Sequence, residues 1–164
     1  MAHAALWYDA SGMSCPYFYP VEPCAGGSGP RDAMLPLGDA WAGECRAVPG
    51  EFWQPEEATL RPLCNLGYAR GQCARFPPDE GPDAVRFAVS RDDGAGLRIY
   101  CVVERDHHPF AHGPLEYSLA AGEGGAGLPA CPAWQAGRPA PLLARQAQAY
   151  VESYLRRKKE ASSQ

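Results

Sequence analysis

Cysteine is the residue type whose number and distribution in this sequence point most directly to chemistry. The chain of 164 residues contains seven cysteines, about three times the share of an ordinary soluble protein. In a reducing compartment, grouped cysteines bind metal or do redox chemistry more often than they form structural disulfides. Metal binding is therefore the first chemistry to consider for the seven: Cys15, Cys24, Cys45, Cys64, Cys73, Cys101 and Cys131.

Four of these cysteines share one kind of local sequence. Each lies near glycine or proline and within reach of an aromatic residue. Small neighbours allow backbone N–H groups to turn toward a thiolate or sulfide, and aromatic rings exclude water, so both features suit a metal centre. Four thiolates match the ligand set of one tetrahedral zinc ion or one 4Fe–4S cluster. We predict one cofactor-binding and metal-binding site made by Cys15, Cys45, Cys64 and Cys73.

The spacing of these four cysteines favours an iron–sulfur cluster over zinc. Structural zinc sites usually contain short C-x2-C pairs, and this sequence has none. The ligands of a cubane cluster can arrive from separated loops, and a cysteine followed by proline, as at Cys15-Pro16, occurs in ferredoxin-type ligation. We therefore expect a 4Fe–4S protein with an electron-transfer, redox-sensing or structural role, and we favour such a role over catalysis.

Three alternatives use the same residues differently. The four cysteines, or cysteines together with His107, His108 or His112, would suit a structural zinc module for protein interaction. A metal with an open coordination position would make a small metalloenzyme with a Cys/His site, in which a histidine or a carboxylate such as Asp39 or Glu44 moves protons. The thiols would also fit as unrelated side chains packed in loops, because reduced cysteine fills space as a small hydrophobe.

The remaining three cysteines have different surroundings. Cys24 lies in Glu-Pro-Cys-Ala-Gly-Gly-Ser-Gly, a setting that fixes nothing around its sulfur, and it is our first reserve ligand. Cys101 alternates with Ile99 and Val103 on the apolar side of an expected strand, so we assign it to the core. Cys131 lies in a Gly-rich segment far along the chain and would be a ligand only if that segment folds back.

Three histidines lie close together after the second expected strand, at His107, His108 and His112. Pro109 prevents the helix that would bring two histidines four residues apart onto one face, so the logic of a helical zinc motif does not apply. We predict a connecting loop with solvated histidines. In a functional site they would serve as proton carriers or as one non-thiolate ligand.

Residues 11–82 must position the four cysteines, and we predict that they form ordered loops with one short helix. Eleven prolines in this segment exclude long regular elements. The helix is predicted over residues 54–66, because Pro55 suits a first helical position. Pro62 should split or kink it, and a following glycine such as Gly67 can end it.

The rest of the chain has clearer periodicity. Residues 83–119 alternate apolar and polar positions in three runs, and the short connections between them favour a three-stranded antiparallel meander. Residues 120–139 are rich in Gly, Ala and Pro and are predicted to be a linker loop. Residues 140–160 have the spacing of a long amphipathic helix, with cations at the end that the helix dipole favours. The expected fold is α+β, in a single domain over residues 1–164.

Composition excludes several classes of function. The 15 basic and 19 acidic residues give a net charge of −4, without the basic patch of a nucleic-acid binder. No apolar run is long enough to span a membrane, and the N-terminus does not resemble a secretory signal, so we expect a cytoplasmic protein. Motifs for nucleotide binding and for the common hydrolases are absent. A redox or protein partner fits this profile, and nothing in the sequence indicates an oligomeric state.

Overall fold

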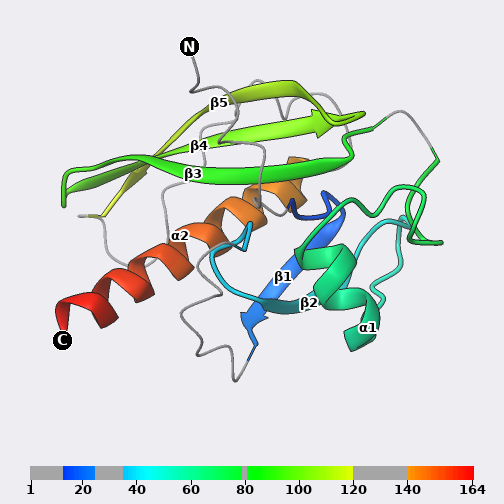
Figure 1. Ribbon diagram of the computed structural model, residues 1–164, viewed down its shortest axis with the longest axis horizontal. Helices are drawn as coiled ribbons and strands as arrows, with labels where there is room; N and C mark the ends of the chain where they lie inside the picture. Colours follow the sequence, from blue (N-terminus) through cyan, green and yellow to red (C-terminus); the bar gives the residue numbers. More distant parts are fainter. Residues whose placement is uncertain (1–12, 25–34, 79–80, 120–139) are drawn as a thin grey trace, which may run out of the picture.

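The computed structural model describes residues 13–24, 35–78, 81–119 and 140–164. Two antiparallel sheets, a short helical segment and a long C-terminal helix make a mixed α+β fold, which confirms the predicted class. Figure 1 shows the C-terminal helix lying beneath the larger sheet, with the smaller sheet beside it. The predicted linker over residues 120–139, which includes Cys131, lies outside the described residues.

The larger sheet is the predicted meander. Its strands follow one another in the order in which they occur in the chain, as short antiparallel connections require. The buried positions alternate along the central strand, which places Cys101 in the core, fully buried and opposite Phe87. The three strands are β3 (Ala84–Asp92), β4 (Gly96–Arg105) and β5 (His108–Ser118).

The third strand begins earlier than expected, which corrects our prediction for the histidine segment. The turn between β4 and β5 consists of Asp106 and His107, which both have positive φ. His108 and His112 lie within β5 and not in a connecting loop. Pro109 is compatible with this strand because β5 lies at the edge of the sheet and its register with β4 shifts beside this residue, and proline is tolerated at edges and bulges.

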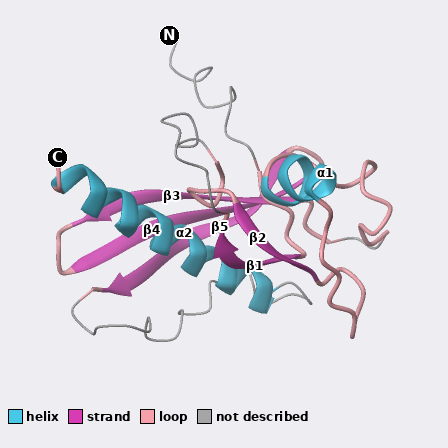
Figure 2. Ribbon diagram, turned by 90° about the horizontal axis from the view of Figure 1, so that it is seen from below, coloured by secondary structure: helices cyan, strands magenta, loops and turns pink. Residues whose placement is uncertain are grey.

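The helix α2 (Ala140–Ser162) confirms the predicted C-terminal helix. It crosses one face of the larger sheet (Figures 1 and 2) and contacts β1 as well as β3. Leu143, Ala147 and Val151 are buried on its inner side, as their spacing along the helix predicts. This helix therefore joins the sheet to the N-terminal part of the chain.

The N-terminal part also contains a small sheet that our prediction of loops missed. Its strands β1 (Phe18–Pro23) and β2 (Trp41–Cys45) are antiparallel, with Phe18 opposite Cys45. The register shifts between Pro20 and Glu22. Each strand of a two-stranded sheet has one unpaired side, so prolines are tolerated where a central strand would reject them. The prolines that argued against regular structure therefore occur within it.

The short helix forms, but in a different shape from the one predicted over residues 54–66. It starts as α1 (Glu57–Thr59) and continues as a π-helix, η2 (Leu60–Asn65). Pro62 lies inside η2 and lacks the N–H that a regular α-helical turn needs, so a wider turn is consistent with its presence. The chain leaves η2 through Gly67, whose φ of +106° is open to glycine.

Candidate metal centre

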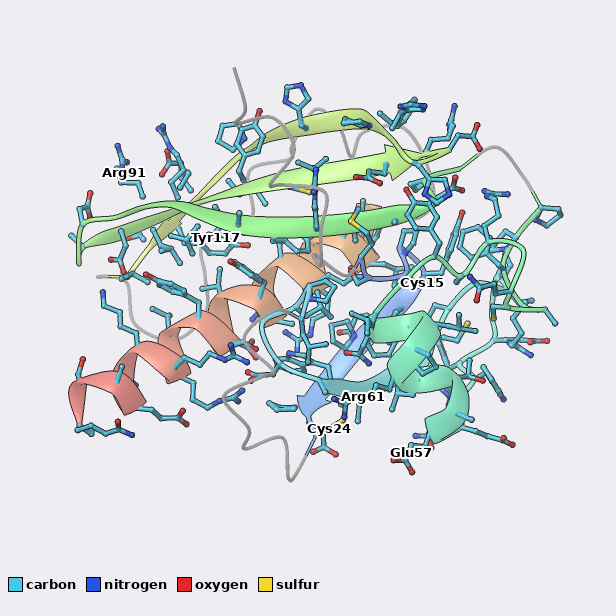
Figure 3. All side chains as sticks on the ribbon, viewed as in Figure 1. Cys15, Cys24, Glu57, Arg61, Arg91 and Tyr117 are labelled. Atoms are coloured by element: carbon cyan, nitrogen blue, oxygen red, sulfur yellow. The ribbon has the colours of Figure 1, made fainter. Side chains whose placement is uncertain are left out.

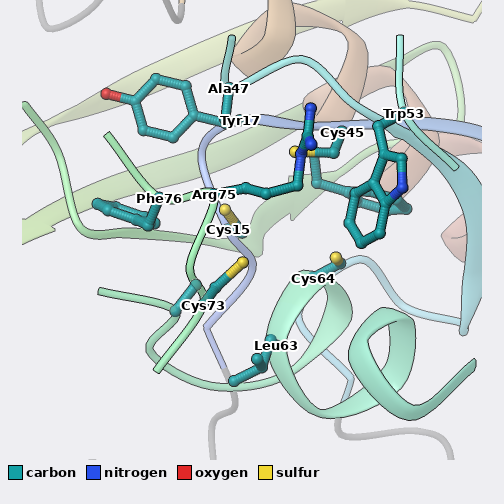
Figure 4. Close-up of a pocket in the computed structure, with 12 residues that line it drawn as sticks. Cys15, Tyr17, Cys45, Ala47, Trp53, Leu63, Cys64, Cys73, Arg75 and Phe76 are labelled. Carbon is teal, nitrogen blue, oxygen red and sulfur yellow. The ribbon is translucent and has the colours of Figure 1, made fainter. Parts of the chain in front are cut away.

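The four cysteines predicted as ligands line a single cavity. Their sulfur atoms lie around a common space in Figure 4, although each cysteine comes from a different segment of the chain. Cys15 precedes β1, Cys45 ends β2, Cys64 belongs to η2, and Cys73 lies in the turns that follow. The structure thus brings together all four residues of the predicted site, and metal binding by them stays a prediction.

Backbone hydrogen bonds hold the four segments in place. The N–H of Cys15 donates to the carbonyl oxygen of Cys64 at 3.0 Å, so two of the segments are joined directly at their cysteines. Cys45 and Trp53 exchange two backbone bonds, at 2.6 and 3.1 Å. The N–H of Cys73 donates to the carbonyl oxygen of Ala69 at 2.7 Å, which closes a turn. Each cysteine backbone is therefore anchored by the fold around the cavity.

Two buried amide side chains extend this support. Gln146 of α2 donates through Nε2 to the carbonyl oxygens of Cys15 and Phe18, each at 2.7 Å. Asn65, which follows Cys64, accepts from the N–H of Trp41 at 2.9 Å and donates to the carbonyl oxygen of the same residue at 2.9 Å. The first amide attaches the Cys15 segment to α2, and the second attaches η2 to the start of β2.

Aromatic and aliphatic side chains make up most of the cavity wall. The Tyr17 and Phe76 rings meet edge to face, with their centroids 5.4 Å apart. Cys15, Cys45 and Cys64 are buried, and Cys73 is half-buried. Such a wall limits the access of water to the sulfur atoms. The lining residues besides the cysteines are Tyr17, Phe18, Ala47, Trp53, Leu63, Ala69, Arg75 and Phe76.

Burial also sets the protonation state of the thiols. Burial, with smaller contributions from the nearby Cys45 and Cys73, raises the pKa of Cys64 to about 12. Burial likewise raises the pKa of Cys15 above its usual range, with smaller contributions from the other three cysteines of the cavity. These thiols therefore stay protonated at neutral pH unless a cation is present, and a bound metal would stabilise their thiolate forms.

None of the described cysteines forms a disulfide bond. Within the described ranges, no three His, Cys, Asp or Glu side chains are grouped as the ligands of one metal ion. The four thiols of the cavity instead surround a shared space from different sides (Figure 4).

The reserve ligand Cys24 lies apart from this cavity. It follows β1, at the opposite end of that strand from Cys15, and its sulfur is near Arg61 (Figure 3). Its N–H donates to the carbonyl oxygen of Ala40 at 2.8 Å. Burial, followed by nearby acidic groups, raises the pKa of this thiol, and Arg61 opposes the rise. Cys24 is therefore a free thiol in a different environment.

The three histidines also lie outside this cavity. His107 stacks on Tyr68 with ring centroids 4.1 Å apart. His112 stacks on Tyr100, and its Nδ1 is within 2.5 Å of the Tyr100 hydroxyl. His108 is exposed in β5. None of the three lines the cavity of the four cysteines among the residues that the structure describes.

The two carboxylates considered as acid or base groups form ion pairs. Asp39 pairs with Arg156 and with Arg157, the latter at 2.9 Å, near the C-terminal end of α2. Glu44 pairs with Arg46 at 3.0 Å. Neither carboxylate lines the cavity, so their placement gives no support to a proton-transfer role beside the cysteines.

Sequence reasoning missed Arg75, Trp53 and Gln146. Arg75 lies two residues after Cys73 and Trp53 lies eight residues after Cys45, but proximity in sequence did not indicate that both line the cavity. Gln146 is three residues after Leu143, on the buried side of the predicted helix, and a polar residue at such a position is a usable signal. A buried amide needs partners, which Cys15 and Phe18 supply.

Comparison of the chain with protein-family models, with curated proteins and with solved structures gives no match. None of the helices in the described part of the chain has the length and apolar character needed to cross a membrane. The geometry of the site is therefore the basis for its function.

Proposed function

We propose that the chain binds one 4Fe–4S cluster through Cys15, Cys45, Cys64 and Cys73. One observation carries this proposal: four cysteines from four separate segments line one mostly apolar cavity. Four unrelated thiols have no reason to gather in this way, because any small apolar side chain would fill the same space. The expected roles are electron transfer, redox sensing or stabilisation of the fold.

The arrangement suits a cluster better than a single zinc ion. A zinc ion requires four sulfurs that converge to about 2.3 Å from one point. A cubane instead takes one thiolate at each of its four irons, so the ligands approach from different sides of a larger object. The four cysteines line one cavity (Figure 4), and among the described residues no three ligating side chains are grouped around the position of a single ion. The separated segments that supply them are compatible with a cluster and differ from the short pairs of zinc modules.

Ligation by four thiolates also bears on the choice between electron transfer and catalysis. When each iron has a cysteine ligand, no iron has an open position for substrate. The apolar wall shields the cluster from water, and burial and hydrogen bonds to the sulfurs then tune its reduction potential. We infer a non-enzymatic role, with a partner that donates or accepts one electron in a reducing compartment such as the cytoplasm.

The first test is the metal content of protein purified without oxygen. Iron, acid-labile sulfide and zinc are measured on one sample, together with the visible spectrum, before and after reconstitution with iron and sulfide. We expect a brown protein with about four irons and about four sulfides per chain. A colourless protein with one zinc per chain would establish the zinc module instead, and a protein that takes up neither metal would refute both.

Serine variants identify the ligands. Replacement of Cys15, Cys45, Cys64 or Cys73 should reduce the cluster content, because serine is a poor ligand for these irons. The matched control is Cys24→Ser, which removes a thiol outside the cavity and should keep the full cluster. Circular dichroism shows whether each variant is folded. Full iron and sulfide in the Cys64→Ser protein would contradict the assignment.

A further inference from the structure

Arg75 brings a positive charge into the wall of the cysteine cavity. Among the described lining residues it is the only one with a charged side chain. Figure 4 shows its guanidinium group beside the sulfur of Cys45, while its backbone lies two residues beyond Cys73. The side chain therefore reaches across the cavity from one cysteine segment to another.

Contacts on several sides hold the guanidinium group in this position. Its Nη2 donates to Oε2 of Glu51 at 2.7 Å. The group lies over the Trp53 ring, 4.8 Å from the ring centroid. The carboxylate of Glu51 raises the pKa of Arg75, and a hydrogen bond with Cys45 contributes to this rise. An arginine fixed by a salt bridge and an aromatic ring keeps its remaining N–H groups in a defined orientation.

One donor of this group is left over. The Nε of Arg75 is buried and has no hydrogen-bond partner among the described residues. A buried donor without an acceptor is costly, and such cases require a specific reason. The cavity that Arg75 lines also contains the four cysteine sulfurs, which become strong acceptors only when they are thiolates or belong to a bound cluster.

We propose that Arg75 donates a hydrogen bond to a sulfur of the bound cluster and thereby raises the reduction potential of the cluster. This inference rests on the proposed 4Fe–4S site. Reduction takes one electron from an external donor and changes the cluster from 2+ to 1+, with no bond broken. The added negative charge is stabilised by a fixed guanidinium group and by N–H···S hydrogen bonds. Arg75 thus favours the reduced cluster over the oxidised one.

Substitution of Arg75 tests this role through the potential. In Arg75→Met the charge and the donors are lost, and in Arg75→Lys the charge is kept without the Nε donor. We expect the equilibrium constant for reduction to fall about tenfold in the methionine variant, equivalent to about 59 mV for a one-electron couple. The lysine variant should lie between this variant and the wild type. Potentials are measured by mediated titration with dithionite.

Arg46→Met is the matched control. It removes the same charge from the residue next to Cys45, but the Arg46 side chain lies against Glu44 and Tyr19 and does not line the cavity. Its potential should remain at the wild-type value. Equal potentials in the wild type and Arg75→Met would overturn the inference while leaving the cluster assignment intact. A wild-type protein without a cluster would refute the proposed function itself.

A second measurement applies if Arg75→Met fails to assemble a cluster. Wild-type protein labelled with 15N-arginine is reduced, and pulsed electron paramagnetic resonance detects nitrogen nuclei close to the paramagnetic cluster. We expect a 15N coupling that persists in Arg46→Met and disappears in Arg75→Lys. The absence of any arginine coupling in the wild type would overturn the hydrogen bond directly.

Discussion

Gln146 connects the C-terminal helix to the segment that carries Cys15, so its replacement tests how the fold supports the site. The side chain is fully buried. Its Nε2 donates to the carbonyl oxygens of Cys15 and Phe18, each at 2.7 Å, and its Oε1 accepts from the hydroxyl group of Ser14 at 2.7 Å. The Gln146→Met variant removes all three bonds and keeps a side chain of similar volume.

The magnitude follows from the groups that lose their partners. The Phe18 carbonyl oxygen is left without this donor, at about 1–3 kcal/mol. The Cys15 carbonyl oxygen loses less, because it still accepts from the N–H of Phe18 at 3.1 Å. Ser14 keeps its bond to the carbonyl oxygen of Val85 at 3.2 Å, so the loss at its hydroxyl group is smaller. The similar volume of methionine avoids a large cavity term. We expect the free energy of unfolding to fall by about 2–4 kcal/mol, a large share of the roughly 5–15 kcal/mol typical of a domain.

Urea denaturation followed by tryptophan fluorescence measures this fall in the free energy of unfolding. The wild type and the variants are compared at the same metal content. Gln148→Met is the control, because it makes the same change on the same helix at an exposed position. Surface substitutions of this kind usually change the free energy of unfolding by no more than about 0.5 kcal/mol. A difference below about 1 kcal/mol between the two variants would refute the reasoning, since the loss of these buried hydrogen bonds should cost more than that.

Two further predictions concern packing and pH. In Gly43→Ala the new Cβ would lie 2.1 Å from the Tyr19 carbonyl oxygen. We expect the free energy of unfolding, measured by urea denaturation, to fall by about 2–4 kcal/mol. Gly96→Ala should be almost neutral, because its Cβ would meet nothing closer than 3.5 Å. Lys158, and then Tyr154, lower the pKa of Asp92 to about 2 from an ordinary value of 3.8, so its favourable contribution is complete above about pH 4 and is lost as the pH falls toward 2. The melting temperature of the wild type should fall more steeply than that of Asp92→Asn over this range, and parallel profiles would contradict the assignment.

The regular elements of the second half of the chain were predictable because their signals are local. Alternation around Phe87 and Cys101 indicates strands that bury one face, and the spacing of Leu143, Ala147 and Val151 indicates a helix that does the same. Both patterns can be recognised without knowing which surface the strand or helix packs against. The start of β5 was missed because Pro109 argues against a strand unless that strand is known to be at an edge.

The N-terminal half shows the opposite case. Pro20 and Pro23 argued for loops, and only the pairing of β1 with β2 shows that they occupy a two-stranded sheet. The local sequence predicted that four cysteines form one group, and the fold places all four around one cavity: Cys15, Cys45, Cys64 and Cys73. Metal binding at this cavity is still a prediction, which the iron and sulfide analysis decides.

The sequence by itself determined the chemistry available to this protein, its α+β class and the elements with strong periodicity. Those properties depend on residue types and on neighbours within a few positions, so short stretches of sequence are enough to predict them. The tertiary structure alone decided which segments meet: Gln146 reaches the carbonyl oxygen of Cys15 across 131 positions of the chain, and Arg75 reaches Glu51 across 24. Such contacts depend on how the helix and sheets pack, because burial and hydrogen bonding between distant segments are satisfied only in the complete fold.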